Sequence, residues 1–407
     1  MISVIRKNYL IIFPIIVIVL IAQIEKYDQL TTSGTFGAAI RLAIPICLAG
    51  LGGMFSERTG IVNIGLEGMM IMGTWFGAWA AWLYGPWYGI LAGIFGGALF
   101  GLIHAVGTVT FQVDHIVSGV AINILAAGVA RFLNVVAYAD QPTQSSTQSP
   151  RIDGEVGDFT MPYLSGGYDT PSFFGYLQDL NYPFISDFAG LLLGASSNLS
   201  YISLFALTLI PIAAWILWST PFGLQMRSVG ELPTGSESLG VNVYLMKYIG
   251  VIISGGFAGL AGAYLVLESS GIYREGQTAG RGFIGLASMI FGNYRPFGIF
   301  MGSGLFGFAD ALQLRSDDAV HGLLVLISVI LLILAIKQLI EKKYINASAS
   351  IVMSIGFLIW FLNSETVPSE FVYFTPHLTT LIVLSSASQK LRMPQKVGQP
   401  YRKGELN

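Results

Sequence analysis

Charged residues are scarce in this chain of 407 residues. Asp, Glu, Lys and Arg together make up 11% of the sequence, whereas a soluble domain carries about 25%. The 21 basic and 23 acidic residues nearly cancel, which leaves a net charge of −2. A soluble globular enzyme, a nucleic-acid-binding protein and a disordered chain each need far more charge, so the composition excludes these three classes.

Residues that build disulfide frameworks, metal sites and nucleotide-binding loops are also few. Cys47 is the single cysteine, and the four histidines do not have the spacing of zinc ligands. The sequence contains no G-x-S-x-G elbow, no H-E-x-x-H motif and no Gly-Lys dipeptide, so a Walker A loop is missing. We therefore expect a protein that is not an enzyme and holds no metal or cofactor. If ATP drives its activity, another chain must bind and hydrolyse that ATP.

Apolar residues dominate the chain instead. Hydrophobic types make up 53% of it, and the mean hydropathy is +0.66. A bilayer core of about 30 Å is crossed by about 20 apolar helical residues. Such runs lie at 9–24, 35–54, 60–83, 87–109, 115–137, 201–219, 247–267, 282–294, 297–312, 319–337, 349–363 and 369–385. They predict an all-α membrane protein, a polytopic bundle of about 10–12 transmembrane helices in one domain over 1–407.

The distribution of basic residues predicts the orientation of these spans. With a cytoplasmic N-terminus and alternating crossings, 14 of the 21 Lys and Arg residues lie on the cytoplasmic side and five lie outside. This bias satisfies the positive-inside rule and predicts a multi-pass protein of the cell (inner) membrane with both termini cytoplasmic. The first run, 9–24, is expected to be an uncleaved anchor. The short runs 282–294 and 349–363 are the ones that could be re-entrant rather than spanning.

Two hydrophilic segments interrupt the bundle. The extracytoplasmic segment 138–200 carries seven acidic residues and one basic residue, and is either a solvated loop or a partly ordered cap that touches an external partner. The cytoplasmic loop 220–246 is the longest internal one. Pro233 suits the first turn of a short helix and Gly240 suits its end. A short surface helix of this kind is typical of a docking element for a peripheral protein; the alternative is an ordinary linker.

Polar side chains inside the spans are the candidates for function, because they are costly there. Asn63 and Glu67 are four residues apart and would share one face of a helix over 60–83. They either line a translocation path or hydrogen-bond to another helix, for example to Arg41 or Arg131. Isolated polar candidates are Asn123, Asn134 and Asp310.

Small residues recur at the four-residue spacing that allows helices to approach closely. The pattern is found in Gly93-Gly97-Gly101, in Gly255-Gly259 and in Gly298-Gly302. It predicts tight helix packing; the alternative is that these glycines allow helices to slide between two states.

Several segments resemble one transporter family. The run SERTGIVNIGLEGMMIMG (56–73) is similar to the hallmark of permease subunits of bacterial ABC importers, in the branched-chain amino acid and simple-sugar class and closest to its nucleoside-uptake branch. The loop GLQMRSVGELPTGSESLGVNV resembles the coupling loop of that family. The segments SGGFAGLAGAYL, FGNYRPFG and PQKVGQPYRKGE also fit its patterns. The resemblance covers about residues 35–137, 201–315 and 368–403.

The coupling-loop match carries over residue by residue. The matching residues are Arg227, Gly230, Glu231, Pro233, Gly240 and Val243. The chain departs from the pattern at Leu232, where the family has Asn, and at Gly235-Ser236, where it has Ala-Ala. Segments 138–200 and 319–363 look like insertions, the second an extra helical hairpin, and 386–407 is expected to be a cytoplasmic tail.

The resemblance implies a permease that forms a translocation path for nucleosides. The intramembrane polar residues Asn63, Glu67, Asn123 and Asp310 are then the expected path residues. It implies a cytoplasmic ABC ATPase that binds the ATP, a second permease subunit in a heterodimer and an extracytoplasmic substrate-binding lipoprotein, with no nucleic-acid partner. Two alternatives stay open: a ribose- or galactose-type sugar permease of the same class, and an ion-coupled secondary transporter, which needs paired intramembrane charges.

Overall fold

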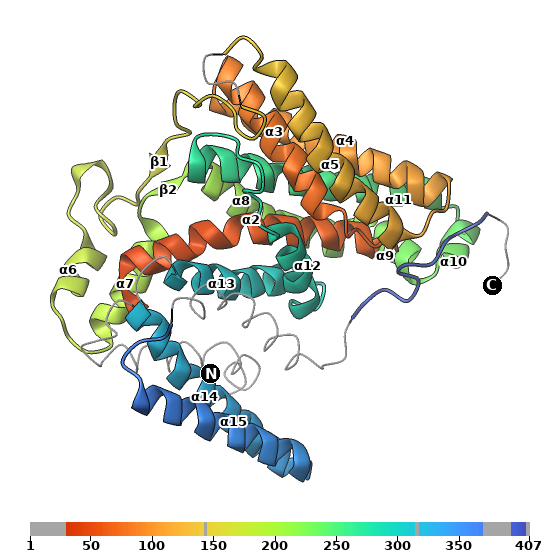
Figure 1. Cartoon of the computed structure of the whole chain (residues 1–407). Helices are drawn as coiled ribbons and strands as arrows, with labels where there is room; N and C mark the ends of the chain where they lie inside the picture. Colours follow the sequence, from red (N-terminus) through yellow and green to blue (C-terminus); the bar gives the residue numbers. More distant parts are fainter. Residues whose placement is uncertain (1–29, 142–144, 314–316, 369–391, 404–407) are drawn as a thin grey trace. The chain divides into compact units, whose positions relative to one another are not determined.

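The computed structural model describes residues 30–141, 145–313, 317–368 and 392–403 (Figure 1). The predicted spans 9–24 and 369–385 lie outside these residues. Within them the elements are helices, apart from a two-stranded sheet of β1 (Asp158–Phe159) and β2 (Leu199–Ser200). The all-α fold class is therefore confirmed. The chain divides into two compact units, and each is described by itself.

The larger unit comprises residues 41–158, 200–306 and 380–407. It holds most of α2 (Ser33–Arg58) and most of α13 (Pro296–Gln313). Its other helical elements are α3 (Leu66–Tyr84), α4 (Pro86–Ala105), η2 (Val106–Thr110), α5 (His115–Ala137), α8 (Tyr201–Ser219), α9 (Pro221–Glu231), α10 (Pro233–Ser238), α11 (Val243–Tyr264), η4 (Leu265–Ser270) and α12 (Arg281–Phe291). The π-helical turns η2 and η4 continue α4 and α11 without a break.

Helices α3, α4 and α11 pack pairwise around a seam of small residues (Figure 1). A Cβ built on Gly97 would lie 2.2 Å from the backbone oxygen of Gly255, and one on Gly259 would lie 2.2 Å from the oxygen of Gly93. A Cβ on Gly73 would lie 2.3 Å from the oxygen of Gly259. The three backbones are therefore in direct contact, which confirms the tight packing expected from the glycine spacing.

Six described helices are long and apolar enough to cross a membrane: Ser33–Arg58, Pro86–Thr110, His115–Ala137, Tyr201–Ser219, Val243–Ser270 and Tyr344–Asn363. The predicted runs 115–137 and 201–219 match α5 and α8 to the residue. The predicted run 282–294 corresponds to α12, whose 11 residues span about 16 Å, about half of a bilayer core. The total of 10–12 spans stays a prediction.

The smaller unit comprises residues 1–40, 159–199 and 307–379. Its described elements include η3 (Gly167–Asp169), α6 (Phe173–Asp179), α7 (Ile185–Ser196), α14 (Asp317–Ile340) and α15 (Tyr344–Asn363). Helices α14 and α15 pack together as a hairpin; that 319–363 is an insertion stays a prediction. The presence of α6 and α7 shows that part of the predicted segment 138–200 is ordered.

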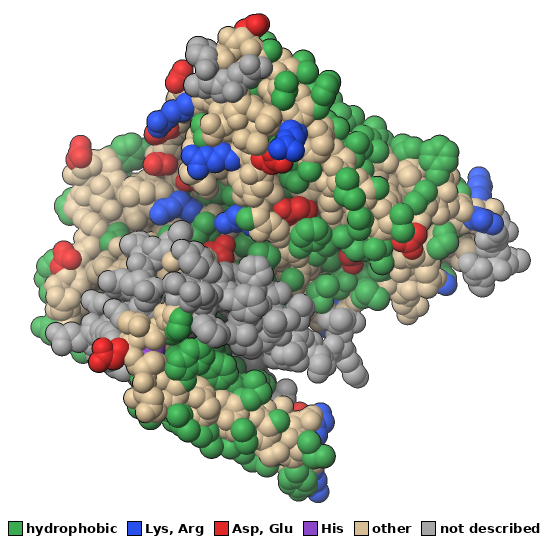
Figure 2. Space-filling model, viewed as in Figure 1, with side chains coloured by type: hydrophobic (Ala, Val, Ile, Leu, Met, Phe, Trp, Pro, Cys, Tyr) green, Lys and Arg blue, Asp and Glu red, His purple; other side chains and the backbone are tan. Residues whose placement is uncertain are grey.

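The helix surfaces of both units are apolar. On α5, Ile116, Ile124 and Phe132 are exposed, and on α15 Val352 and Leu362 are exposed. Figure 2 shows hydrophobic side chains along the α14–α15 hairpin and Lys and Arg at its end. A helix surface of this kind is suited to lipid rather than water.

Candidate functional site: a polar cluster at the start of α3 and the adjoining α9–α10 region

The connection between α2 and α3 is a short loop whose bends are fixed by side chains. Gly60 has a φ of +90°, a conformation that favours glycine and ends α2. The Ser56 hydroxyl donates to the backbone oxygen of Ile61 over 2.7 Å, and the Thr59 hydroxyl donates to that of Ser56 over 2.7 Å. Helix α3 begins at Leu66. The family-like segment 56–68 is therefore a helix end, a loop and a helix start.

Asn63 lies in this loop, so the prediction that it shares a helical face with Glu67 was wrong. Residues 61–65 form a loop and a turn, and α3 begins only at Leu66, so the start of the predicted helix over 60–83 is not helical. Asn63 is fully buried and its Nδ2 donates to the Ser254 hydroxyl on α11 over 2.8 Å. Among the described residues its Oδ1 has no hydrogen-bond partner.

Asn123 on α5 holds the start of α3 from the side. Its Oδ1 accepts the backbone N–H of Gly68 over 2.7 Å, and its Nδ2 donates to the backbone oxygen of Ile64 over 3.1 Å. The N–H of Gly68 is one of the donors that the first turn of a helix leaves without an intrahelical acceptor. Asn123 therefore acts as a cap supplied by a neighbouring helix.

Glu67 binds the backbone at the start of α12. Its two oxygens accept the N–H of Gly280 over 2.9 Å and the N–H of Gly282 over 2.7 Å. A carboxylate is favoured at a helix N-terminus, where free N–H groups and the helix dipole both attract negative charge. A Cβ on Gly282 would lie 2.6 Å from the Glu67 nitrogen, so the absence of a side chain there lets α3 and α12 approach.

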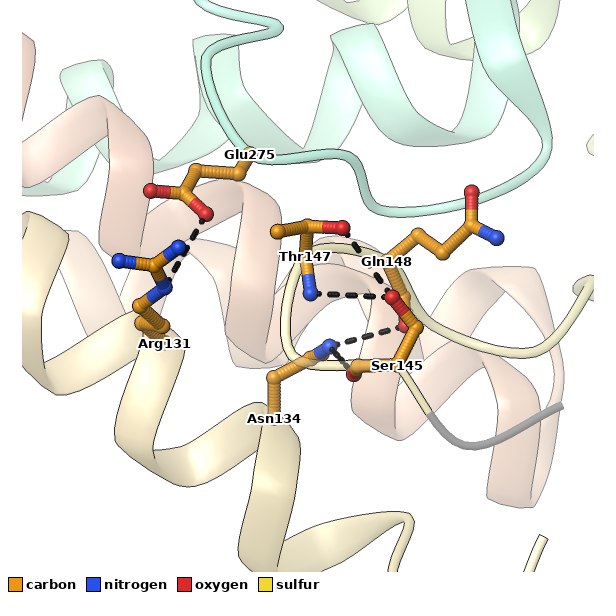
Figure 3. Close-up of polar contacts among 6 residues, drawn as sticks. All are labelled: Arg131, Asn134, Ser145, Thr147, Gln148 and Glu275. Carbon is orange, nitrogen blue, oxygen red and sulfur yellow. Dashed lines mark hydrogen bonds and ion pairs between the residues drawn. The ribbon is translucent and has the colours of Figure 1, made fainter.

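Asn63 and Glu67 each hydrogen-bond to a distant helical segment, as one of the two alternatives predicted. Their partners are not Arg41 and Arg131. Arg131 pairs with Glu275, with 3.5 Å between Nε and Oε2 (Figure 3). That these residues also line a path stays a prediction. Asp310 is half-buried on α13, in the part of that helix that belongs to the smaller unit.

Asn134, the remaining polar candidate, organises the segment that follows α5. Its Nδ2 donates to the backbone oxygens of Ser145 and Gln148 over 2.7 and 2.8 Å (Figure 3). Gln148 in turn forms a β-bridge with Arg274. The beginning of the predicted external segment is thereby bound to the loop that precedes α12.

The loop 220–246 contains the short helix that its sequence predicts. Helix α9 is capped by Thr220, whose hydroxyl accepts the N–H of Gly223 over 3.1 Å. Helix α10 begins at Pro233 and ends at Ser238. Gly240 follows with a φ of +84°, so both predicted boundaries of the short helix are confirmed.

Arg227 and Gly230 connect α9 to the end of α2. The guanidinium of Arg227 lies 5.7 Å from the Trp218 ring centre, and that of Arg58 lies 5.4 Å from the same ring. Both distances are within the range of cation–π attraction. A Cβ on Gly230 would lie 2.3 Å from the backbone oxygen of Arg58, so α9 is in backbone contact with the start of the α2–α3 loop.

A second buried group fixes the end of α2. Arg58 Nη2 donates to the backbone oxygen of Tyr294 over 2.9 Å, and the Tyr294 hydroxyl donates to Glu57 Oε2 over 2.9 Å. Glu57 and Arg58 are 5% and 7% exposed, and burial of charged groups is costly unless they are bonded in this way. Trp218 and Tyr294 were not identified from the sequence as connecting residues. Their contacts depend on helices that lie far apart in the chain.

Helix α10 ends in exposed leucines. Leu239 is 87% exposed and Leu232, directly before α10, is 54% exposed, whereas Pro233 and Ser236 on the same helix are buried. Both leucines lie outside the predicted spans, in the loop 220–246. Sequence reasoning treated Leu232 as a departure from a family pattern and did not consider Leu239.

These features define a polytopic helical membrane protein in which an accessible pair of short helices is bound to a buried polar loop. Residues 35–336 match the family model described as branched-chain amino acid transport system / permease component. The match covers well over half of the chain, and the chain belongs to this family of permease components.

Among similar proteins is the guanosine ABC transporter permease protein NupQ of Bacillus subtilis (strain 168). It is 32% identical over 380 residues, which cover 90% of this chain and 96% of NupQ. The nucleoside ABC transporter permease protein NupC of Lactococcus lactis is 38% identical over 276 residues, 66% of this chain and 78% of NupC. A putative glucose ABC transporter permease, TsgC13 of Haloferax volcanii, is 29% identical over 91% of this chain and 98% of its own length. No solved structure matches the chain.

Proposed function

We propose that the chain is the membrane-spanning permease subunit of an ABC importer that carries nucleosides into the cell. We infer the substrate class from two similarities. The chain is similar over nearly its full length to a guanosine permease, and it has a higher identity to a nucleoside permease over a shorter stretch. The importer lies in the cell (inner) membrane with both termini of this subunit in the cytoplasm, as the distribution of basic residues predicts.

The partners in this proposal are a cytoplasmic ABC ATPase, a second permease subunit in a heterodimer and an extracytoplasmic substrate-binding lipoprotein. The chain itself holds no cofactor and does not hydrolyse ATP, in line with the missing Gly-Lys dipeptide. The exposed leucines Leu232 and Leu239 form the apolar part of the surface that the ATPase contacts.

The contacts of α9 suggest how the ATPase moves the path. A displacement of α10 is passed to α9, whose Arg227 shares the Trp218 ring with Arg58. From Arg58 the chain leads directly into the loop that holds Asn63. Path access therefore switches because the ATP-bound ATPase has different affinities for the two states of this region.

Asn63, Glu67, Asn123 and Asp310 are the proposed path residues. Within this set, Asn63 offers a buried amide oxygen without a hydrogen-bond partner among the described residues. Such an oxygen could accept a hydrogen bond from the hydroxyl or amino groups of a nucleoside. Glu67 and Asn123 shape the path by fixing the start of α3.

The sugar alternative is favoured by one observation, the similarity to the putative glucose permease TsgC13. The ion-coupled alternative is disfavoured, because both Glu67 oxygens bind backbone N–H groups at α12. A carboxylate bonded in this way is suited to a structural role rather than to exchange of an ion.

Transport by the complete complex distinguishes these functions. The permease would be reconstituted in vesicles with its ATPase, second permease and lipoprotein, and uptake of radiolabelled guanosine would be measured with ATP inside. We expect ATP-dependent uptake that unlabelled uridine or adenosine reduces and that glucose or ribose does not. Uptake that only sugars inhibit supports the sugar alternative, and uptake by the permease alone on a proton gradient contradicts an ATP-driven importer.

A further inference from the structure

The segment 392–403 near the C-terminus packs within the larger unit against the α9–α10 region. Tyr401 is 7% exposed and belongs to the same hydrophobic core cluster as Met226 of α9 and Val243 of α11. Its ring centre lies 5.5 Å from that of Tyr244. The buried tyrosine therefore indicates that this segment is anchored to the larger unit.

The backbone of this segment joins two parts of the candidate site. The N–H of Lys396 donates to the backbone oxygen of Gly230 over 3.0 Å, at the end of α9. Two residues later, the N–H of Gly398 donates to the backbone oxygen of Gly60 over 3.1 Å, in the α2–α3 loop. The stretch 396–398 therefore bridges α9 and the loop that leads to Asn63.

Side chains attach the segment to both short helices. The Tyr401 hydroxyl donates to Glu237 Oε2 on α10 over 2.5 Å, and the N–H of Gln395 donates to Glu231 Oε2 on α9 over 3.2 Å. Burial and the neighbouring Glu237 carboxylate raise the pKa of Tyr401. Hydrogen bonds to a charged acceptor are about twice as strong as neutral ones.

The end of the segment is bound to a third element. Gln112, in the turn between η2 and α5, accepts from Arg402 Nε through its Oε1 over 2.8 Å and donates through its Nε2 to the backbone oxygen of Tyr401 over 3.3 Å. The segment is thus held on both sides of the tyrosine that contacts α10.

We propose that residues 392–403 form a strap that takes part in coupling the ATPase to the path. Tyr401 positions α10 through Glu237, and the backbone at 396–398 transmits the displacement of α9 to the α2–α3 loop. Tyr401 is a positioning residue and touches no substrate. The inference rests on the proposed role of α9 and α10 as the ATPase contact. It adds a second connection beside the Arg227–Trp218–Arg58 contact.

The test compares Tyr401→Phe, which removes the hydroxyl and keeps the ring, with Tyr344→Phe as a matched control. Tyr344 is an exposed tyrosine on α15. In the reconstituted complex, guanosine uptake and ATP hydrolysis would be measured together. We expect Tyr401→Phe to lower the uptake per ATP hydrolysed roughly ten-fold or more, the effect of losing one hydrogen bond to a charged acceptor. The control leaves this ratio unchanged.

The partner residue supplies an internal check. Glu237→Leu is expected to lower the ratio as Tyr401→Phe does, and the double variant should be no worse than either single one, because both remove the same bond. Glu237→Gln keeps an acceptor oxygen and should retain most of the coupling. An unchanged ratio in Tyr401→Phe overturns the proposal, and so does a loss of thermal stability or abundance without a change in the ratio.

A further variant distinguishes whether the proposed role of the strap or the proposed ATPase contact at α10 is wrong. Leu239→Asp changes the exposed end of α10 and leaves the contacts of the strap in place. If Leu239→Asp abolishes co-purification of the ATPase while Tyr401→Phe leaves the ratio unchanged, the strap alone is wrong. If Leu239→Asp has no effect on co-purification or uptake, the ATPase contact at α10 is wrong.

Discussion

At the scale of single residues, Glu67 is the polar group whose structural contribution is best defined. Both of its oxygens hold backbone N–H groups at the start of α12. We expect Glu67→Ala to leave these donors without an acceptor and to cost roughly 1–3 kcal/mol of stability. Thermal unfolding in detergent, followed by tryptophan fluorescence, measures the loss.

Glu67→Gln is the matched control for this change. It keeps one carbonyl oxygen as an acceptor and is expected to be affected less than Glu67→Ala. A Glu67→Ala protein with unaltered thermal unfolding and full transport would show that the two bonds contribute nothing. A stable variant without transport would instead support the proposed path role.

Trp218 is the second residue with a defined expectation. The guanidinium groups of Arg58 and Arg227 lie 5.4 and 5.7 Å from its ring centre. Each cation–π contact contributes roughly 0.5–2 kcal/mol. Trp218→Leu is therefore expected to weaken coupling and lower guanosine uptake per ATP hydrolysed, whereas Trp218→Phe keeps an aromatic face and most of the uptake. Equal uptake in both variants would contradict the connection through this ring.

Arg227→Glu tests the same connection from the side of α9. The substitution removes the cation over Trp218 and the bond from Arg227 Nε to the backbone oxygen of Leu217, which is 2.8 Å long. We expect ATP hydrolysis without matching uptake, while the permease stays in the complex. Co-purification of all subunits, measured beside uptake, checks this outcome. Unchanged uptake would count against a coupling role for Arg227.

Several of these residue-level contacts could not be predicted from the sequence. Periodicity placed Asn63 and Glu67 on one helix, but Asn63 lies in the loop before α3 and Glu67 lies in the first turn of α3, which begins at Leu66, so each has a different partner. The partners are Ser254 and the start of α12, about 190 and 215 residues away in the chain. Sequence spacing describes neighbours within one element, and it cannot identify contacts made by the packing of distant helices.

At the scale of elements, prediction from the sequence was more successful. Uninterrupted apolar runs bounded by polar residues defined α5 and α8 to the residue. Proline and glycine defined α10, because a proline fixes φ for a first turn and a glycine accepts the φ of +84° after the last one. The prediction was weakest where a helix begins inside an apolar run, as α3 does at Leu66 within the run 60–83.

The α4–α11 contact gives a prediction at this scale. A Cβ at Gly97 would meet the backbone oxygen of Gly255 at 2.2 Å, and backbone cannot move aside as a flexible side chain can. Gly97→Ala is therefore expected to separate the two helices and to destabilise the protein by about 1–3 kcal/mol, the usual cost of overpacking. The measurement is the midpoint of thermal unfolding in detergent.

Gly128→Ala on α5 is the control for helix propensity alone. No atom lies within 4 Å of a Cβ built there, and alanine is favoured over glycine in a helix by about 1 kcal/mol. This variant should be as stable as the unaltered protein or more so. If Gly97→Ala behaves in the same way, the direct backbone contact of α4 and α11 is not essential.

At the scale of the whole molecule, the two compact units correspond to a distinction already visible in the sequence. The larger unit contains the segments that resemble the permease family, including 56–73, 220–246 and the strap. The smaller unit contains most of the two segments predicted to be insertions, 138–200 and 319–363. The site proposed for coupling therefore lies within the larger unit.

The orientation in the membrane is the last property that needs a direct test, because every coupling argument places α10 on the ATPase side. The single native cysteine, Cys47, is buried, so Cys47→Ser provides a background without a reactive thiol. Leu239→Cys (87% exposed) and Tyr168→Cys (78% exposed) then report the two predicted sides. We expect a membrane-impermeant maleimide added to intact cells to label the cysteine at 168 and not the one at 239. Inverted vesicles should give the opposite result. Labelling of position 239 from outside the cell would show that the orientation predicted from the basic residues is wrong. The exposed leucine would then lie away from any cytoplasmic ATPase.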